Sequence, residues 1–145
     1  NFNPGTGAEL KGKTLGIQAY GNVGRLVARL AQGFGMNVLA FDPFVPAEKM
    51  LAEGVTPVDA LAELYKRSDY VSLHIPANDQ TRKSVNYSLM SLMPKGACLV
   101  NTARKEVIDE ADLATVLADI ARLEKLRQHA TTRQHILRQK LNLKE

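Results

Sequence analysis

The chain has 145 residues, of which 45% are hydrophobic and 23% charged, which is ordinary for one globular domain. No apolar run approaches the roughly 20 residues needed to cross a bilayer, so we expect a cytoplasmic protein with no membrane partner. The net charge of +4 comes from the end of the chain, because residues 121–145 carry seven Lys or Arg and only two Glu. The first residue is not Met, and we expect the sequence to be processed or cut from a longer one.

Short apolar runs alternate with stretches of helical periodicity over most of the chain. The runs that indicate buried strands lie at 14–19, 37–41, 55–58, 70–74 and 97–101. The stretches that indicate helices lie between them, at 23–34, 46–53, 60–66 and 87–93. This alternation predicts an α/β fold, a doubly wound parallel sheet of about five strands with right-handed crossovers. The lone cysteine, Cys98, lies in the last apolar run, so we expect it to be buried and unreactive.

The end of the chain has a different composition. From Asp109 onward there is neither Gly nor Pro, and Asp109 with Asp112 resembles a helix start. We predict one long C-terminal helix, or two helices broken near residues 131–132. Because the positive charge is concentrated there, we predict two parts, a domain of residues 1–119 and a basic helical segment of residues 120–145.

A glycine-bearing turn follows the first predicted strand and opens the first predicted helix. It is Ala19-Tyr20-Gly21-Asn22-Val23-Gly24, the G-x-G-x-x-G fingerprint with alanine in the first glycine position. Gly21 would let the backbone approach a pyrophosphate, Gly24 would let helix and strand pack closely, and the helix N-terminus would favour phosphates.

An acidic residue stands where a dinucleotide site needs one. Asp42 ends the second predicted strand, eighteen residues after Gly24. Its carboxylate suits the ribose hydroxyls of NAD and would repel the 2′-phosphate of NADP, and residues 43–45 supply no cation to offset that repulsion. The sequence therefore predicts an NAD site, with a purely structural turn as the alternative.

Further motifs occur in an order and spacing typical of one known family. They are Leu10-Lys11-Gly12-Lys13-Thr14-Leu15-Gly16-Ile17, the glycine turn, Gly33-Phe34-Gly35-Met36, Phe41-Asp42-Pro43, Ser72-Leu73-His74-Ile75-Pro76, Thr81, Leu92-Met93-Pro94-Lys95-Gly96 and Val100-Asn101-Thr102-Ala103-Arg104. Together they resemble the NAD-binding domain of D-2-hydroxyacid dehydrogenases over about residues 9–117. The resemblance implies a Rossmann-type fold, and within the family residues 74–81 and 101–105 look most like phosphoglycerate dehydrogenases.

The resemblance also implies roles for particular residues. In this family a hydride passes between C2 of a 2-hydroxy acid and nicotinamide, and Arg104 corresponds to the catalytic arginine that holds the substrate carboxylate. Besides the glycine turn and Asp42, the residues implied to contact the cofactor are His74, Pro76, Thr81, Asn101, Thr102 and Ala103. His74 is implied to be a wall of the cofactor site rather than the catalytic base. No metal site is implied.

The resemblance is incomplete, and this limits the expected activity. The family's base lies in a later Pro-His segment and its Glu partner in an Asp-Val-Phe-Glu-like segment, and this sequence contains neither. The segments that build the family's substrate domain are also missing from it. We therefore expect NAD binding without turnover by this chain alone, with a small 2-hydroxy acid as partner only in the complete enzyme.

Residues 120–145 resemble nothing in the family and leave other functions open. A seam of alternating core positions is seven-ninths apolar and would allow helix pairing, hence a homodimer or larger assembly: Leu113, Val116, Ile120, Leu123, Arg127, Ala130, Gln134, Leu137 and Leu141. In that alternative the Rossmann core is a scaffold for a self-association or partner-binding helix. A simpler alternative is that residues 113–123 cover the sheet. Nucleic acid is not an expected partner, because the cations are spread around the helix and no aromatic accompanies them.

Overall fold

The computed structural model describes residue 7 and residues 9–142, with side chains described up to residue 131 except at residue 129. Its elements in chain order are β1 (Thr14–Gln18), α1 (Asn22–Gly33), β2 (Asn37–Phe41), α2 (Ala47–Ala52), β3 (Thr56–Pro57), α3 (Leu61–Arg67), β4 (Tyr70–Leu73), α4 (Tyr87–Met90), β5 (Cys98–Asn101), the 3-10 helix η1 (Lys105–Val107) and α5 (Glu110–Asn142). The chain divides into two compact units between Asp109 and Glu110.

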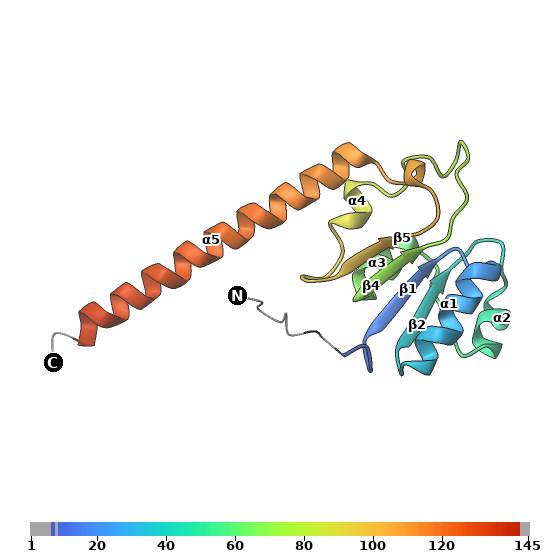
Figure 1. The fold of residues 1–145 in the computed structure, drawn as a ribbon, viewed down its shortest axis with the longest axis horizontal. Coiled ribbons are helices and arrows are strands. Elements are labelled where there is room, and N and C mark those ends of the chain that lie inside the picture. Colours follow the sequence, from blue (N-terminus) through green and yellow to red (C-terminus); the bar gives the residue numbers. More distant parts are fainter. Residues whose placement is uncertain (1–6, 8, 143–145) are drawn as a thin grey trace. The chain divides into compact units, whose positions relative to one another are not determined.

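The first unit is built on a parallel sheet with the strand order β3-β2-β1-β4-β5 (Figure 1). In the registers of the central strand, Ile17 of β1 stands beside Ala40 of β2 and Ser72 of β4. The chain moves outward from β1 through β2 and β3, then returns to β4 and moves outward the other way. The carboxyl ends of β1 and β4 therefore flank the topological switch point, where ligands bind in open parallel sheets. The predicted α/β fold with five parallel strands is confirmed.

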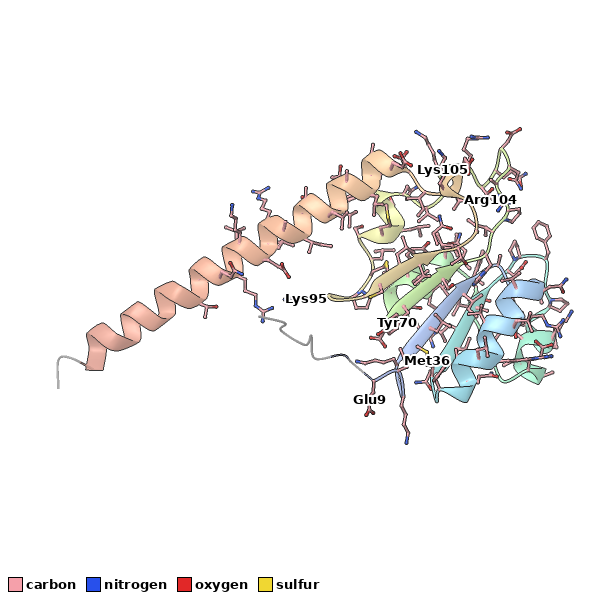
Figure 2. All side chains as sticks on the ribbon, in the orientation of Figure 1. Glu9, Met36, Tyr70, Lys95, Arg104 and Lys105 are labelled. Atoms are coloured by element: carbon pink, nitrogen blue, oxygen red, sulfur yellow. The ribbon has the colours of Figure 1, made fainter. Side chains whose placement is uncertain are left out.

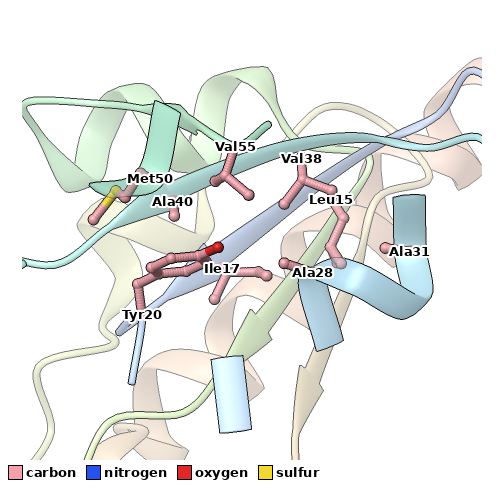
Figure 3. Close-up of a cluster of buried hydrophobic side chains, with 9 residues drawn as sticks. All are labelled: Leu15, Ile17, Tyr20, Ala28, Ala31, Val38, Ala40, Met50 and Val55. Atoms are coloured by element: carbon pink, nitrogen blue, oxygen red, sulfur yellow. The ribbon is translucent and has the colours of Figure 1, made fainter. Parts of the chain in front are cut away.

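Successive residues of β1 face opposite sides of the sheet, and both sides are covered. Leu15 and Ile17 belong to a buried cluster against α1 and α2 (Figure 3), with Tyr20, Ala28, Ala31, Val38, Ala40, Met50 and Val55. On the other side, Gly16 approaches α3 so closely that a Cβ there would lie 2.2 Å from Ser68 Oγ. Helices on both faces of a parallel sheet make the arrangement doubly wound, as the sequence predicts.

Helix α1 forms where predicted, but its small residues rather than its large ones face the sheet. Gly24, Ala28 and Ala31 are buried, whereas the large apolar residues whose spacing predicts the helix are mostly exposed: Val23, Leu26, Leu30 and Phe34. Small side chains let the helix axis approach the strands, and this turns the larger side chains outward.

The expectation that Cys98 is buried is wrong, because this cysteine is exposed. Its strand, β5, is the edge of the sheet, and Val100 on the same side of that strand is 42% exposed. An apolar run predicts a strand but does not tell whether another element covers it. Among the described residues of the first unit, none covers that side of β5.

The second unit is α5, a single helix of 33 residues without the predicted alternative break. Thr131 remains helical with its hydroxyl donating to the Arg127 carbonyl oxygen at 3.0 Å, a bond to the preceding turn. The predicted boundary between residues 119 and 120 falls inside this helix and stays a prediction. Gln134, Leu137 and Leu141 of the predicted seam lie outside the described side chains. No helix in the described part of the chain is long and apolar enough to cross a membrane.

Candidate cofactor and active site

The turn between β1 and α1 is held in a tight, partly strained shape. Ala19 has φ +76°, a left-handed conformation that side chains with a Cβ rarely adopt. Its N–H donates to the Phe41 carbonyl oxygen at 2.9 Å, which extends the pairing of β1 with β2. A Cβ on Gly24 would lie 2.4 Å from the Ala19 carbonyl oxygen, so only glycine fits there. The close helix–strand approach expected of Gly24 is therefore present.

The start of α1 is open in the way that a pyrophosphate requires. Gly21 is the N-cap, no side chain caps the helix there, and its first turn contains no acidic residue. A Cβ built on Gly21 would meet nothing within 4 Å. Asn22 and Val23 follow as the exposed first residues of the helix. The N–H groups of a helix start and its positive dipole end favour phosphate oxygens, so these residues fit a dinucleotide.

Asp42 is already oriented by the backbone around it. Its Oδ2 accepts a hydrogen bond from the Tyr20 N–H at 2.8 Å, and its Oδ1 accepts one from the Phe44 N–H at 2.9 Å. Each carboxylate oxygen can accept a second bond, so the group retains capacity for ribose hydroxyls. The half-buried carboxylate follows β2 directly, at the same carboxyl end of the sheet as the glycine turn.

The carboxyl ends of β4 and β5 and the start of α1 enclose a cleft of about 470 Å³. Six of the residues predicted for the site line this cleft: Val23, His74, Pro76, Thr102, Ala103 and Arg104. Ile75 and Ala77 also line it and were not singled out from the sequence. Their position on either side of Pro76 was the available signal, because a loop that lines a cleft exposes neighbouring residues to it.

His74 lies at the wall of this cleft, with its ring held from behind. The His74 Nε2 and the Ser72 hydroxyl are 2.9 Å apart, and the His74 backbone N–H donates to the Gln18 carbonyl oxygen at 3.0 Å. Burial lowers the pKa of His74, which favours a neutral imidazole at physiological pH. A neutral, half-buried ring suits a lining role beside a cofactor.

Asn101 shapes the loop that carries Arg104. Its Oδ1 accepts from the Ala103 N–H at 3.0 Å, and its Nδ2 donates to the Arg104 carbonyl oxygen at 3.0 Å. Arg104 itself is exposed at the carboxyl end of the sheet (Figure 2), with its guanidinium donating to the Ala103 carbonyl oxygen at 3.0 Å. A planar guanidinium at the mouth of the cleft can grip a carboxylate with two hydrogen bonds.

Two predicted site residues have side chains engaged elsewhere. The Thr81 hydroxyl donates to the Pro76 carbonyl oxygen at 2.5 Å and accepts from the Asn78 N–H at 2.9 Å, so Thr81 braces the loop after β4. The Tyr20 side chain is only 1% exposed and lies in the hydrophobic cluster (Figure 3). Among the described residues no group of His, Cys, Asp and Glu side chains could hold a metal ion.

The fold and the site define a dinucleotide-binding module, and comparison with known proteins identifies which one. The family model described as D-isomer specific 2-hydroxyacid dehydrogenase, NAD binding domain, matches residues 2–125. The chain belongs to this family, and NAD is the cofactor of the domain.

Relatives and solved structures agree with this placement. D-3-phosphoglycerate dehydrogenase of Methanocaldococcus jannaschii is 42% identical over 113 residues, covering 78% of this chain and 22% of the relative. (S)-sulfolactate dehydrogenase of Chromohalobacter salexigens is 42% identical with the same coverage of this chain and 37% of the relative. The NAD⁺-bound 3-phosphoglycerate dehydrogenase of Entamoeba histolytica superposes with a TM-score of 0.74 at 38% identity, covering 81% of this chain and 37% of that one. The chain thus spans between about a fifth and two fifths of the length of these proteins.

Proposed function

We propose that this chain is the cofactor-binding part of a D-2-hydroxyacid dehydrogenase of the D-3-phosphoglycerate dehydrogenase kind. One observation supports the proposal. The open glycine turn, Asp42 and the cleft all lie at the carboxyl end of the sheet. A ligand that needs a pyrophosphate site, a diol acceptor and an apolar-walled slot along one edge is a dinucleotide.

The residues divide this work by position. Gly21, Asn22, Val23 and Gly24 would receive the pyrophosphate at the start of α1, and Asp42 would accept the ribose hydroxyls. The cleft residues His74, Pro76, Thr102 and Ala103 would form the nicotinamide wall. Bound NAD supplies the hydride acceptor.

Arg104 would act on the substrate rather than on the cofactor. Its exposed guanidinium stands where a 2-hydroxy acid could approach the cleft, and it would hold the carboxylate and orient the reacting carbon. Which acid binds is a finer proposal. Relatives of similar identity are named for phosphoglycerate and for sulfolactate, so this region serves enzymes of different acids. D-3-phosphoglycerate is the first candidate to test with the complete enzyme.

Calorimetric titration of the purified chain with NAD, NADH and NADP tests the proposal. We expect saturable binding of NAD and NADH and weaker binding of NADP, because a 2′-phosphate would meet the Asp42 carboxylate. Equal affinity for NADP would contradict the role of Asp42. No binding of any of them would contradict the proposed function.

A second proposal concerns assembly, and exposed apolar side chains support it. In α5 these are Leu117, Ile120, Leu123 and Leu126, and on the edge strand β5 Val100 is also exposed. Unpaired edges and apolar helix faces tend to find partners, and symmetric pairing is the commonest assembly. We propose a homodimer or larger homo-oligomer that depends on α5.

Light scattering at several concentrations, on the full chain and on a chain that ends at Asp119, tests the assembly. We expect a full-length dimer and a truncated monomer. A full-length monomer at tens of micromolar would refute self-association, and a truncated dimer would move the interface from α5 to the sheet edge.

A further inference from the structure

The glycine turn contains a strained residue, Ala19, whose conformation needs support from neighbouring contacts. Ala19 occupies the position where the fingerprint has glycine, and it adopts φ +76°. Such a conformation costs an alanine free energy that glycine does not lose, and it persists only where neighbouring contacts enforce it. The geometry of the site for pyrophosphate depends on this residue, because Gly21 follows two positions later.

The residue after Ala19 is anchored in a way that can supply the support. The Tyr20 ring is buried, and its hydroxyl donates to Glu53 Oε2 at 2.8 Å, at the end of α2. Arg25 of α1 forms an ion pair with the same carboxylate, and its Nε donates to Oε2 at 2.9 Å. Glu53 thus joins the glycine turn, α1 and the end of α2.

The same anchor reaches the acidic residue of the ribose site. The Tyr20 backbone N–H donates to Asp42 Oδ2 at 2.8 Å. Tyr20 is therefore bonded to Asp42 through its backbone and to Glu53 through its hydroxyl. Rotation about Ala19 would break one of these bonds. The contacts of Tyr20 therefore connect the glycine turn with both Asp42 and Glu53.

The protonation states suit a permanent anchor. Burial, with the hydrogen bond to Glu53, raises the pKa of Tyr20 to about 12, so the phenol stays a neutral donor. The hydrogen bonds from Arg25 and Tyr20 lower the pKa of Glu53 to about 2, so it stays a charged acceptor. Charge-assisted bonds of this type are stronger than neutral ones.

We propose that Tyr20, Glu53 and Arg25 form a positioning clamp that holds Ala19 in its left-handed conformation and so sets the affinity for NAD. The proposal rests on the NAD-binding function. It assigns Tyr20 a positioning role, through its buried hydroxyl, in place of direct contact with the cofactor.

The first test needs no cofactor. Tyr20→Phe removes only the hydroxyl and leaves Glu53 paired with Arg25, and Tyr65→Phe is the matched control, since Tyr65 is equally buried and donates to Gln18 Oε1 at 2.8 Å. Amide hydrogen exchange of residue 20, relative to that of Ile17 in the core, should accelerate about 3- to 10-fold in Tyr20→Phe, the range expected for one lost hydrogen bond. Unchanged relative exchange, or the same acceleration in the control, would overturn the clamp.

The second test measures the dissociation constant for NAD. Tyr20→Phe should raise it about 3- to 10-fold and Tyr65→Phe should not. In the Ala19→Gly background the effect of Tyr20→Phe should shrink to less than about twofold, because glycine needs no support at φ +76°. If the Tyr20 hydroxyl only stabilised the fold, Tyr20→Phe would lower stability equally in both backgrounds. The ratio of the NAD dissociation constants with and without this hydroxyl would then be the same in both backgrounds, and that result would refute the proposal. Absence of NAD binding by the unchanged chain would instead refute the proposed function, while the exchange measurement still decides on the clamp.

Discussion

The two halves of the candidate site are built differently. On the β1–β2 side, Asp42 accepts two backbone hydrogen bonds, Gly24 is packed against the Ala19 carbonyl, and Tyr20 is buried beneath the turn. On the β4–β5 side, Pro76, Thr102 and Arg104 are exposed around an open cleft. One half is braced before any ligand arrives, whereas the other presents its groups to solvent.

This difference corresponds to what each half would recognise. The adenosine and pyrophosphate portion of NAD is constant, and a prearranged site loses less entropy on binding it. In the proposed dehydrogenase the nicotinamide portion would lie beside the reacting acid. We call the β1–β2 side the finished half and the β4–β5 side the open half, and the following predictions test this contrast.

The largest effect concerns catalysis on the open half. The purified 145-residue chain should oxidise D-3-phosphoglycerate, or another D-2-hydroxy acid, at a negligible rate with NAD present. The His and Glu that the family resemblance implies as the acid–base pair belong to segments that this sequence does not contain, and such a pair typically contributes about 10²–10⁴-fold. The measurement is NADH formation by absorbance. Robust formation would mean that another residue, His74 first, serves as the base.

Two glycine substitutions should separate folding from binding on the finished half. Gly24→Ala should lower the free energy of unfolding by about 1–3 kcal/mol, because its Cβ would lie 2.4 Å from the Ala19 carbonyl oxygen. Gly21→Ala meets open space, so it should fold normally but bind NAD at least about tenfold more weakly, through loss of the close approach to pyrophosphate. Chemical denaturation and calorimetry give the two quantities. Normal NAD affinity in Gly21→Ala would place the pyrophosphate elsewhere.

The acidic end of the finished half should set cofactor choice. Asp42→Ala should weaken NAD binding by about 1–3 kcal/mol and narrow the gap to NADP, because charged hydrogen bonds to the ribose are lost. Asp42→Asn is the control, since it keeps a side-chain oxygen for one backbone N–H. If NAD binding is the same in all three proteins, Asp42 holds only its own loop.

The smallest effect is a dependence of stability on acid at the clamp. The folded-state pKa of Glu53 is about 2, below the value near 4.3 of an unfolded glutamate, so its ion pair stabilises the fold fully above about pH 5. This contribution should fade as the pH falls from about 5 to about 2. Glu53→Gln should be less stable at neutral pH and lose that part of the acid dependence in denaturation curves. A Glu53→Gln profile parallel to that of the unchanged chain would contradict the depressed pKa.

Much of the fold and several site positions follow from local sequence features. The strand at Asn37–Phe41 forms with the predicted bounds, because an apolar run bounded by turn residues has few alternatives. The glycine turn and Asp42 could be placed together because the carboxyl ends of paired parallel strands share one edge. Arg104 and His74 could be placed at the cleft only with the family resemblance, since isolated Arg and His residues carry no signal of position.

The remainder depended on packing between segments distant in the chain. Cys98 has an apolar environment in sequence but lies on an edge strand, and edge or centre is decided by strand order. Tyr20 is buried in a cluster drawn from several elements, and its hydroxyl donates to Glu53, 33 residues later, although no local pattern links the two. The sequence by itself determined which residues form strands, helices and the glycine turn, because periodicity and backbone preferences act locally. Tertiary structure alone decided which side chains line the cleft and which support the glycine turn from the buried side, because burial and hydrogen-bond partners arise only when the elements pack.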